Sequence, residues 1–210
     1  MKPIKMLNLA MVAAIAALAF IGTGSAGAKT LCHLEPGAPG SGGCPAGELP
    51  YTGSLVAHNV GDVTLLAFAT VECAVSLLEG KITNAGSATT NPKGVIEKMT
   101  FSSCSCGGNA ATAESLNLSW NAELLASATL GNGLLDVTNP RGLFVACFNH
   151  CIYTAGTATA TFLGHSTTAS GLTTVDALIT LSRVALDFFC PATAVWHGVY
   201  TTLPNDLDLH

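Results

Sequence analysis

Apolar and polar residues alternate along most of the chain after residue 50, which is the pattern of half-buried β-strands. The clearest run is ESLNLSWNAELLASATL (114–130), where Leu116, Leu118, Trp120, Ala122 and Leu124 recur at every second position. Similar runs occupy residues 53–60, 62–82, 94–106, 172–190 and 192–203. A helix starting near Ala122 is the competing interpretation of NAELLASATL, because Ala, Glu and Leu favour helices.

Glycine, asparagine and proline interrupt these runs at short intervals. GNGLLDVTNP (131–140) begins with a hairpin signal and ends at a proline. LFVACFNHCIYTAGTATATFLG (143–164) reads as two strands folded about residues 148–150. Many short strands without helices predict an all-β fold, namely an antiparallel β-sandwich of about 9–10 strands with disulfides. A closed β-barrel is the alternative architecture.

The two ends of the chain differ from this β region. Residues 1–28 have the form of a signal peptide, because Lys2 and Lys5 precede an apolar run that ends in small residues. Residues 29–50 are a Gly- and Pro-rich N-terminal arm without periodicity, 51–204 a single β domain, and 205–210 a C-terminal tail. After signal cleavage no transmembrane segment is expected. We expect a secreted, extracellular protein, with the periplasm as the alternative.

The composition narrows the range of partners. Asp and Glu number 13, Lys and Arg only 8, and the basic residues are scattered. Nucleic acid is therefore not an expected partner, since no basic stripe can neutralise its phosphates. Charged residues make up 10% of the chain, and such a weakly charged surface suits self-association or contact with a cell surface or another apolar surface.

All eight cysteines lie after the signal, and an even number in an exported chain predicts disulfides. The expected pairs are Cys32–Cys44, Cys147–Cys151, Cys73–Cys190 and Cys104–Cys106. A hairpin with a three-residue loop would set Cys147 directly opposite Cys151, within disulfide range. Cys104 and Cys106 project to the same side of a strand, so they either bond across a bulge or each take a long-range partner.

Candidate chemistry is sparse. Cys147, His150 and Cys151 have metal-ligand residue types, but export and the even cysteine count favour disulfides, so no metal and no cofactor are expected. GHSTT (164–168) lacks the second glycine of a nucleophile elbow and reads as a polar turn. No carboxylate pair has a spacing that defines a glycosidase. No catalytic residue is predicted, and the large aromatics Trp120, Trp196 and Tyr200 are expected to be core anchors.

Several short motifs resemble those of small exported bacterial β-rich proteins, most of unknown function. They are LSWNA (118–122), GNGLLDVTNP (131–140), the segment from Cys147 to Cys151, and CPATAVWHGVY (190–200). The chain is similar to the PraB-type activators of alkane oxidation, a group associated with biofilms. This resemblance implies an all-β exported fold and offers no catalytic residues. The close Cys104–Cys106 spacing departs from that group.

These observations support three functional hypotheses in order. The first is an exported, non-enzymatic structural or cell-surface or matrix interaction protein. The second is a carrier of a small apolar ligand, which requires a barrel or split sandwich with an empty interior. The third is a cryptic secreted hydrolase.

Overall fold

The structure, a computed structural model, describes residues 29–67, 69–146, 149–184 and 189–210, which contain fifteen β-strands and no helix. The proposed signal peptide lies outside these residues. The strands are β1 (Leu31–Leu34), β2 (Glu48–Pro50), β3 (Gly53–Asn59), β4 (Val63–Leu66), β5 (Thr70–Asn84), β6 (Lys93–Cys106), β7 (Asn109–Leu116), β8 (Trp120–Ala126), β9 (Gly133–Thr138), β10 (Arg141–Ala146), β11 (Asn149–Thr154), β12 (Thr157–Leu163), β13 (Thr174–Arg183), β14 (Thr193–Leu203) and β15 (Leu207–Leu209). None of the described residues forms a helix able to cross a membrane.

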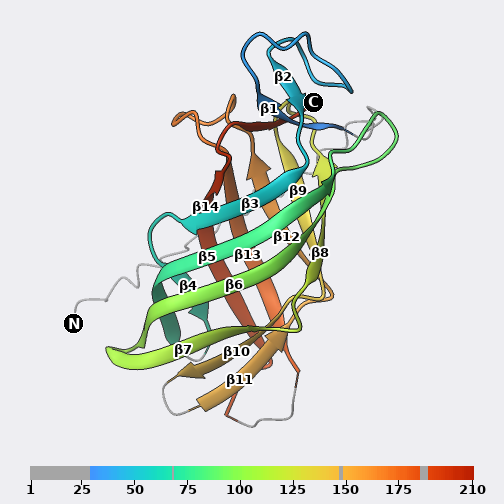
Figure 1. Cartoon of the computed structure of the whole chain (residues 1–210). Coiled ribbons are helices and arrows are strands. Elements are labelled where there is room, and N and C mark those ends of the chain that lie inside the picture. The colour runs from blue at the N-terminus through green and yellow to red at the C-terminus, as the bar shows by residue number, and fades with distance from the viewer. Residues whose placement is uncertain (1–28, 68, 147–148, 185–188) are drawn as a thin grey trace, which may run out of the picture.

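Twelve of these strands close into an eight-stranded antiparallel barrel (Figure 1). The long strands β5, β6, β13 and β14 each fill one position of the barrel. Two short consecutive strands fill each of the other four positions: β3 and β4, β7 and β8, β9 and β10, β11 and β12. One ring of the barrel therefore runs β5–β6–β8–β9–β12–β13–β14–β3, and the other runs β5–β6–β7–β10–β11–β13–β14–β4.

The last long strand closes the barrel against the first strands. Tyr200 of β14 pairs with Asn59 of β3, and Trp196 of β14 pairs with Leu65 of β4. The expected sandwich is therefore wrong, and the barrel alternative is confirmed. The alternation along each strand is the same in both architectures, because it reports one buried face and one exposed face without saying which strands meet.

Strand faces alternate as the sequence predicts. On β12, Ala158, Ala160 and Phe162 are buried while the threonines between them are exposed. On β14, Trp196 and Tyr200 are buried, and His197 between them has a side chain 49% exposed. The aromatic residues expected as core anchors thus point into the barrel, and its outer surface carries hydroxyls and charges together with some apolar residues such as Leu178.

The strands of one wall are interrupted at a common level, which we call the waist (residues 117–119, 139–140 and 155–156). The run 114–130, expected as one strand, is split there into β7 and β8, with Asn117 at a φ of 56°. The helix alternative for residues 121–130 is wrong, because β8 pairs with both β6 and β9. β7 pairs with β6 only through residues 109–111, and β8 pairs with it only from Trp120 onward, so Glu97 to Ser103 of β6 have no ladder partner on that side among the described residues.

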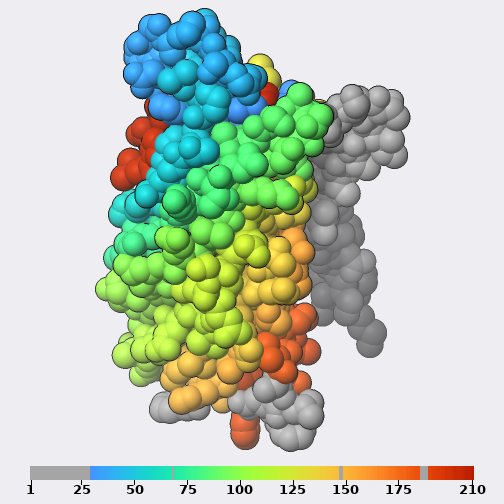
Figure 2. Space-filling model, turned by 45° about the vertical axis from the view of Figure 1, so that its right-hand side comes forward, coloured from blue at the N-terminus to red at the C-terminus, as the bar shows by residue number. Residues whose placement is uncertain are grey.

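The N-terminal arm and the C-terminal tail cover one end of the barrel. Central β1 pairs with β2 on one side and with β15 on the other, which makes a three-stranded sheet that we call the lid. The lid and the arm loops sit at the top of the molecule in Figure 1, and the arm, in blue, caps that end in Figure 2. The arm, expected to contain no regular element, thus supplies two strands.

Leu31, Leu207 and Leu209 are almost fully buried and pack the lid onto Leu124 and Phe162 of the barrel. These leucines occupy alternate positions of β1 and β15, so one face of the lid meets the barrel. The other face carries Asp208 of β15.

The disulfides only partly follow the expected pairing. Cys32–Cys44 is confirmed and closes the arm on itself. Cys73 bonds to Cys104, its direct partner in the β5–β6 ladder, so the Cys73–Cys190 and Cys104–Cys106 pairs are wrong. Cys106 is also disulfide-bonded, which agrees with the alternative that Cys104 and Cys106 each take a long-range partner.

The expected Cys147–Cys151 bond is wrong as well, because Cys151 bonds to Cys190. The β10–β11 register pairs Ala146 with Asn149 and Phe144 with Cys151. The hairpin therefore has a two-residue connection instead of the expected three-residue loop, and this places Cys151 opposite Phe144. Cys147 itself lies outside the described residues.

Candidate functional site: the barrel interior

The barrel encloses an apolar cavity of about 180 Å³, counted as the space in which the centre of a water molecule can move. Side chains from both the lid and the barrel wall surround it. The larger ones include Leu31, Leu55, Leu78, Ile96, Met99, Phe101, Trp120, Leu124, Leu135, Phe144, Phe162, Ile179, Trp196 and Leu207. An engineered apolar cavity of about 150 Å³ stays dry and binds benzene, so this space is large enough for a small organic molecule.

The cavity exists because many inward positions carry very small residues. The alanines and glycines that line it are Ala57, Gly80, Gly94, Ala122, Gly142, Ala158, Ala160 and Ala177. An eight-stranded barrel has an interior that larger side chains can fill or that can hold one small ligand. Here the small residues leave the space open at the middle and the lid end of the barrel.

The opposite end of the barrel is filled. Leu65, Val71, Phe144 and Tyr153 pack there among the Cys73–Cys104 and Cys151–Cys190 disulfides. The remaining pocket between these residues has a volume of only about 10 Å³, no more than one water molecule needs. The cavity is therefore closed by packed side chains at one end and by the lid at the other.

One buried pair of hydroxyls joins Tyr200, which lines the cavity, to Ser76, which does not. The Oη atom of Tyr200, which lines the cavity, lies 3.1 Å from the Oγ atom of Ser76, and both residues are almost fully buried. Burial raises the pKa of Tyr200 to about 12, against a smaller lowering effect of the Ser76 hydrogen bond. Tyr200 is therefore neutral at physiological pH and can donate or accept a hydrogen bond.

Ser76 points inward because the alternation on β5 changes near Asn59. The Asn59 side chain accepts a hydrogen bond from the Ser76 backbone N–H and donates one to the Ala74 carbonyl. Cys73 and Ser76 are then both buried, although they are three positions apart on the strand, and Val75 is 49% exposed. Val71, Cys73, Val75 and Leu77 alternate in the sequence as one face of a strand would, but this irregularity places Val75 outside while Val71 and Cys73 are buried.

The cavity reaches the wall at the waist. Ser115 of β7, Pro140 and Gly142 of β10 line it from one side of the waist, and Trp120 of β8 lines it from the other. The Trp120 indole N–H donates a hydrogen bond to the Leu116 carbonyl at 3.0 Å, which holds β7 and β8 together across the interruption. This wall has fewer ladder bonds than the continuous wall of β5 and β6.

The structure also places the motifs examined for chemistry. His150 is exposed on β11, and the sulfur of Cys151 beside it is bonded to Cys190. That sulfur is therefore not available as a metal ligand. GHSTT (164–168) forms a turn near the lid, as expected. His165 approaches Asp208 to 2.9 Å, but no hydroxyl among the described residues hydrogen-bonds an imidazole, as a nucleophilic triad requires.

The sequence analysis missed the cavity residues and a cluster of Glu48, Asp208 and His210 in the lid. A signal for the cavity was present in TATATFL (157–163), where alanines occupy the inward positions of β12. The sequence Asp208-Leu-His210 places two potential ligands on one face of a strand, but the approach of Glu48 depends on the lid. No known protein family, curated protein or solved structure matches the chain.

Proposed function

We propose that the protein is an exported carrier that binds a small apolar ligand inside the barrel. The observation that supports this proposal most directly is the cavity of about 180 Å³ lined by apolar side chains. An unfilled apolar space of this size costs about 4 kcal/mol of stability relative to a packed core. That cost is a large part of the net stability of an ordinary domain, and an apolar ligand that fills the space offsets it.

The ligand should have an apolar body and one hydrogen-bonding group. Binding pockets of this kind are mostly apolar, with a few polar groups that fix orientation. When Ser76 and Tyr200 share one hydrogen bond, one hydroxyl hydrogen and several lone pairs remain for a ligand. An alcohol, a ketone or a phenol meets this requirement, whereas a permanently charged group would be buried without an opposite charge.

The disulfides support a location outside the cytoplasm. Cys32–Cys44, Cys73–Cys104 and Cys151–Cys190 are typical of proteins in oxidising compartments. We place the carrier in the extracellular space or the periplasm, in keeping with the export signal expected at residues 1–28.

The test is ligand binding by the exported protein. We would extract the purified protein with organic solvent, identify released molecules by mass spectrometry, and then titrate it with the neutral fluorescent probe N-phenyl-1-naphthylamine. One saturable site per chain is expected. Ala160→Leu fills the cavity from β12 and should weaken probe binding at least tenfold.

The matched control is Thr159→Leu, which adds an apolar side chain on the outer face of the same strand. This variant should bind the probe like the unchanged protein, and circular dichroism would check that both variants fold. Ala177→Leu fills the cavity from β13 and gives a second variant. Equal binding by all four proteins would place the probe outside the barrel and contradict the proposal.

The structure identifies no specific residues among those described that would support the first hypothesis, a role at a cell surface or in a matrix. Exposed large apolar side chains occur on several strands, for example Leu66 on β4, Val75 on β5 and Leu178 on β13. Apolar residues scattered singly over a surface are ordinary. The carrier proposal therefore takes precedence over surface interaction.

A further inference from the structure

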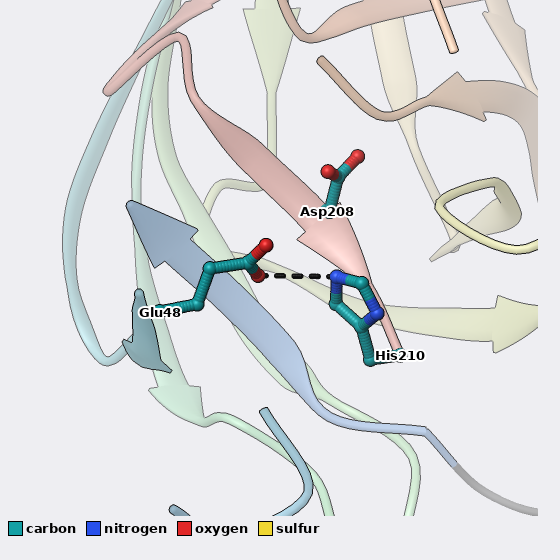
Figure 3. A group of neighbouring side chains, drawn as sticks. All are labelled: Glu48, Asp208 and His210. Carbon is teal, nitrogen blue, oxygen red and sulfur yellow. Dashed lines mark ion pairs between the residues drawn. The ribbon is translucent and has the colours of Figure 1, made fainter. Parts of the chain in front are cut away.

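Three side chains from the two outer strands of the lid approach one another (Figure 3). They are Glu48 of β2, Asp208 of β15 and His210 next to the end of β15. A potential ligand atom from each lies within 4.8 Å of the other two. Asp208 and His210 are two residues apart, so they project from the same face of the strand. The central strand β1 lies between Glu48 and this pair.

Glu48 and Asp208 are buried, His210 is partly buried, and one polar atom of each side chain lacks a hydrogen bond of normal geometry. Asp208 is 1% exposed and Glu48 is 8% exposed. Among the described residues, the Oδ2 atom of Asp208, the Oε2 atom of Glu48 and the Nε2 atom of His210 have no hydrogen-bond partner. Buried polar groups are normally paired, because each unpaired one costs about 1–3 kcal/mol.

The distance between two of these atoms is compatible with a shared cation. His210 Nε2 lies 3.1 Å from Glu48 Oε2, within ion-pair distance but without hydrogen-bond geometry. Two ligand atoms of a tetrahedral zinc ion, each about 2.0–2.1 Å from the metal, lie about 3.3 Å apart. The Glu48–His210 contact has this spacing already, and Asp208 would move inward on binding.

A second set of contacts holds Asp208 in place. The backbone N–H of Ser166 donates a hydrogen bond to Oδ1 of Asp208 at 3.3 Å, and this contact does not use Oδ2. Nδ1 of His165 lies 2.9 Å from that Oδ2 atom. Gly164 packs directly against the carboxylate, where a Cβ atom would collide with it. Metal-binding carboxylates are commonly oriented by such neighbours.

We propose that Glu48, Asp208 and His210 bind a divalent transition metal ion of the zinc class, with His165 as a positioning residue for Asp208. Two carboxylates and an imidazole are a donor set that zinc accepts, whereas calcium and magnesium prefer oxygen ligands alone. The ion neutralises two buried negative charges. It also links Glu48 of β2 to Asp208 and His210 across β1. This link stabilises the lid over the end of the barrel.

The experiment measures zinc binding by the full exported chain after EDTA treatment and dialysis. Isothermal titration calorimetry should give one Zn²⁺ per chain, and Co²⁺ substitution should give visible absorption bands of a bound ion. Zinc should raise the midpoint of thermal unfolding. Glu48→Gln and His210→Gln should each weaken zinc binding at least tenfold and abolish the zinc-dependent rise. His165→Gln should weaken binding about 10- to 100-fold but keep one site per chain.

His33→Gln is the matched control, because His33 lies on β1 of the same lid against Tyr51 and outside the cluster. It should bind zinc like the unchanged protein. Absence of saturable zinc binding, or unchanged binding by Glu48→Gln and His210→Gln, would overturn the proposal and leave only ion pairs at this place. Probe binding in the cavity is measured separately, so either proposal can fail without the other.

Discussion

The hydroxyls of Tyr200 and Ser76 meet inside the barrel, 3.1 Å apart and 124 residues apart in sequence. The contact links the last long strand to an early one at the closure of the barrel. Burial raises the pKa of Tyr200 to about 12. The free energy of unfolding should therefore depend on pH in the alkaline range.

We expect the free energy of unfolding to fall as pH rises from about 10 to about 12. Below pH 10 the tyrosine is protonated in both the folded and the unfolded chain, so its contribution is fully present. Above pH 10 the unfolded chain releases the proton while folded Tyr200 retains it, and stability falls by up to about 1.4 kcal/mol per pH unit. Urea unfolding at pH 9 to 11.5 measures this slope.

Tyr200→Phe is the comparison that isolates this group. Burial and the charge of Asp206 raise the pKa of Tyr51 too, so some slope should remain in the variant. A variant with the same slope as the unchanged protein would show that Tyr200 does not contribute.

The disulfide between Cys73 and Cys104 should be a major source of stability at the filled end. It joins directly opposed residues of β5 and β6 across a sequence separation of 31. In the chain-entropy treatment, such a loop stabilises the fold by about 3–4 kcal/mol. Replacing both cysteines with alanine should lower the unfolding free energy by that amount in denaturant titrations. Probe binding should persist, since neither residue lines the cavity, and a loss below about 1 kcal/mol would contradict the expectation.

Gly94→Ala should be strongly destabilising. A Cβ atom at Gly94, which lines the cavity on β6, would lie 2.6 Å from the Lys81 carbonyl oxygen of β5. The two strands would have to separate, at a cost of about 1–3 kcal/mol. Gly156→Ala is the control, because a Cβ atom there meets nothing within 4 Å. Thermal unfolding of the two variants should differ by several degrees, and equal midpoints would refute the steric argument.

Local features of the fold could be predicted from the sequence. The inward aromatics of β14, the alternation on β12 and the short-range Cys32–Cys44 bond follow from strand periodicity and from close spacing. These features depend on residues near one another in the chain, so the pattern contains the necessary information.

Features that depend on which strands meet could not be predicted. The sandwich and the barrel share one alternation, and the pairing of β14 with β3 and β4, which closes the sheet, separates them. The register of the β10–β11 hairpin places Cys151 opposite Phe144 and leaves it to bond with Cys190. The connection is one residue shorter than the expected three-residue loop, and this difference alone removes the expected Cys147–Cys151 pairing. The Glu48, Asp208 and His210 cluster requires the lid, which brings residues near opposite ends of the chain together.

The pairing of early strands with late strands also affects the order in which the fold assembles. A ribosome makes the chain from its N-terminus, so β3 and β5 exist well before β14 and β15. Neither the wall nor the lid can be completed until β14 and β15 have been made, because β14 pairs with β3 and β4 and β15 pairs with β1. Folds dominated by such distant contacts form slowly. The interior stays open to its surroundings until these strands have paired. A molecule present at that moment would be captured without having to pass through the finished wall.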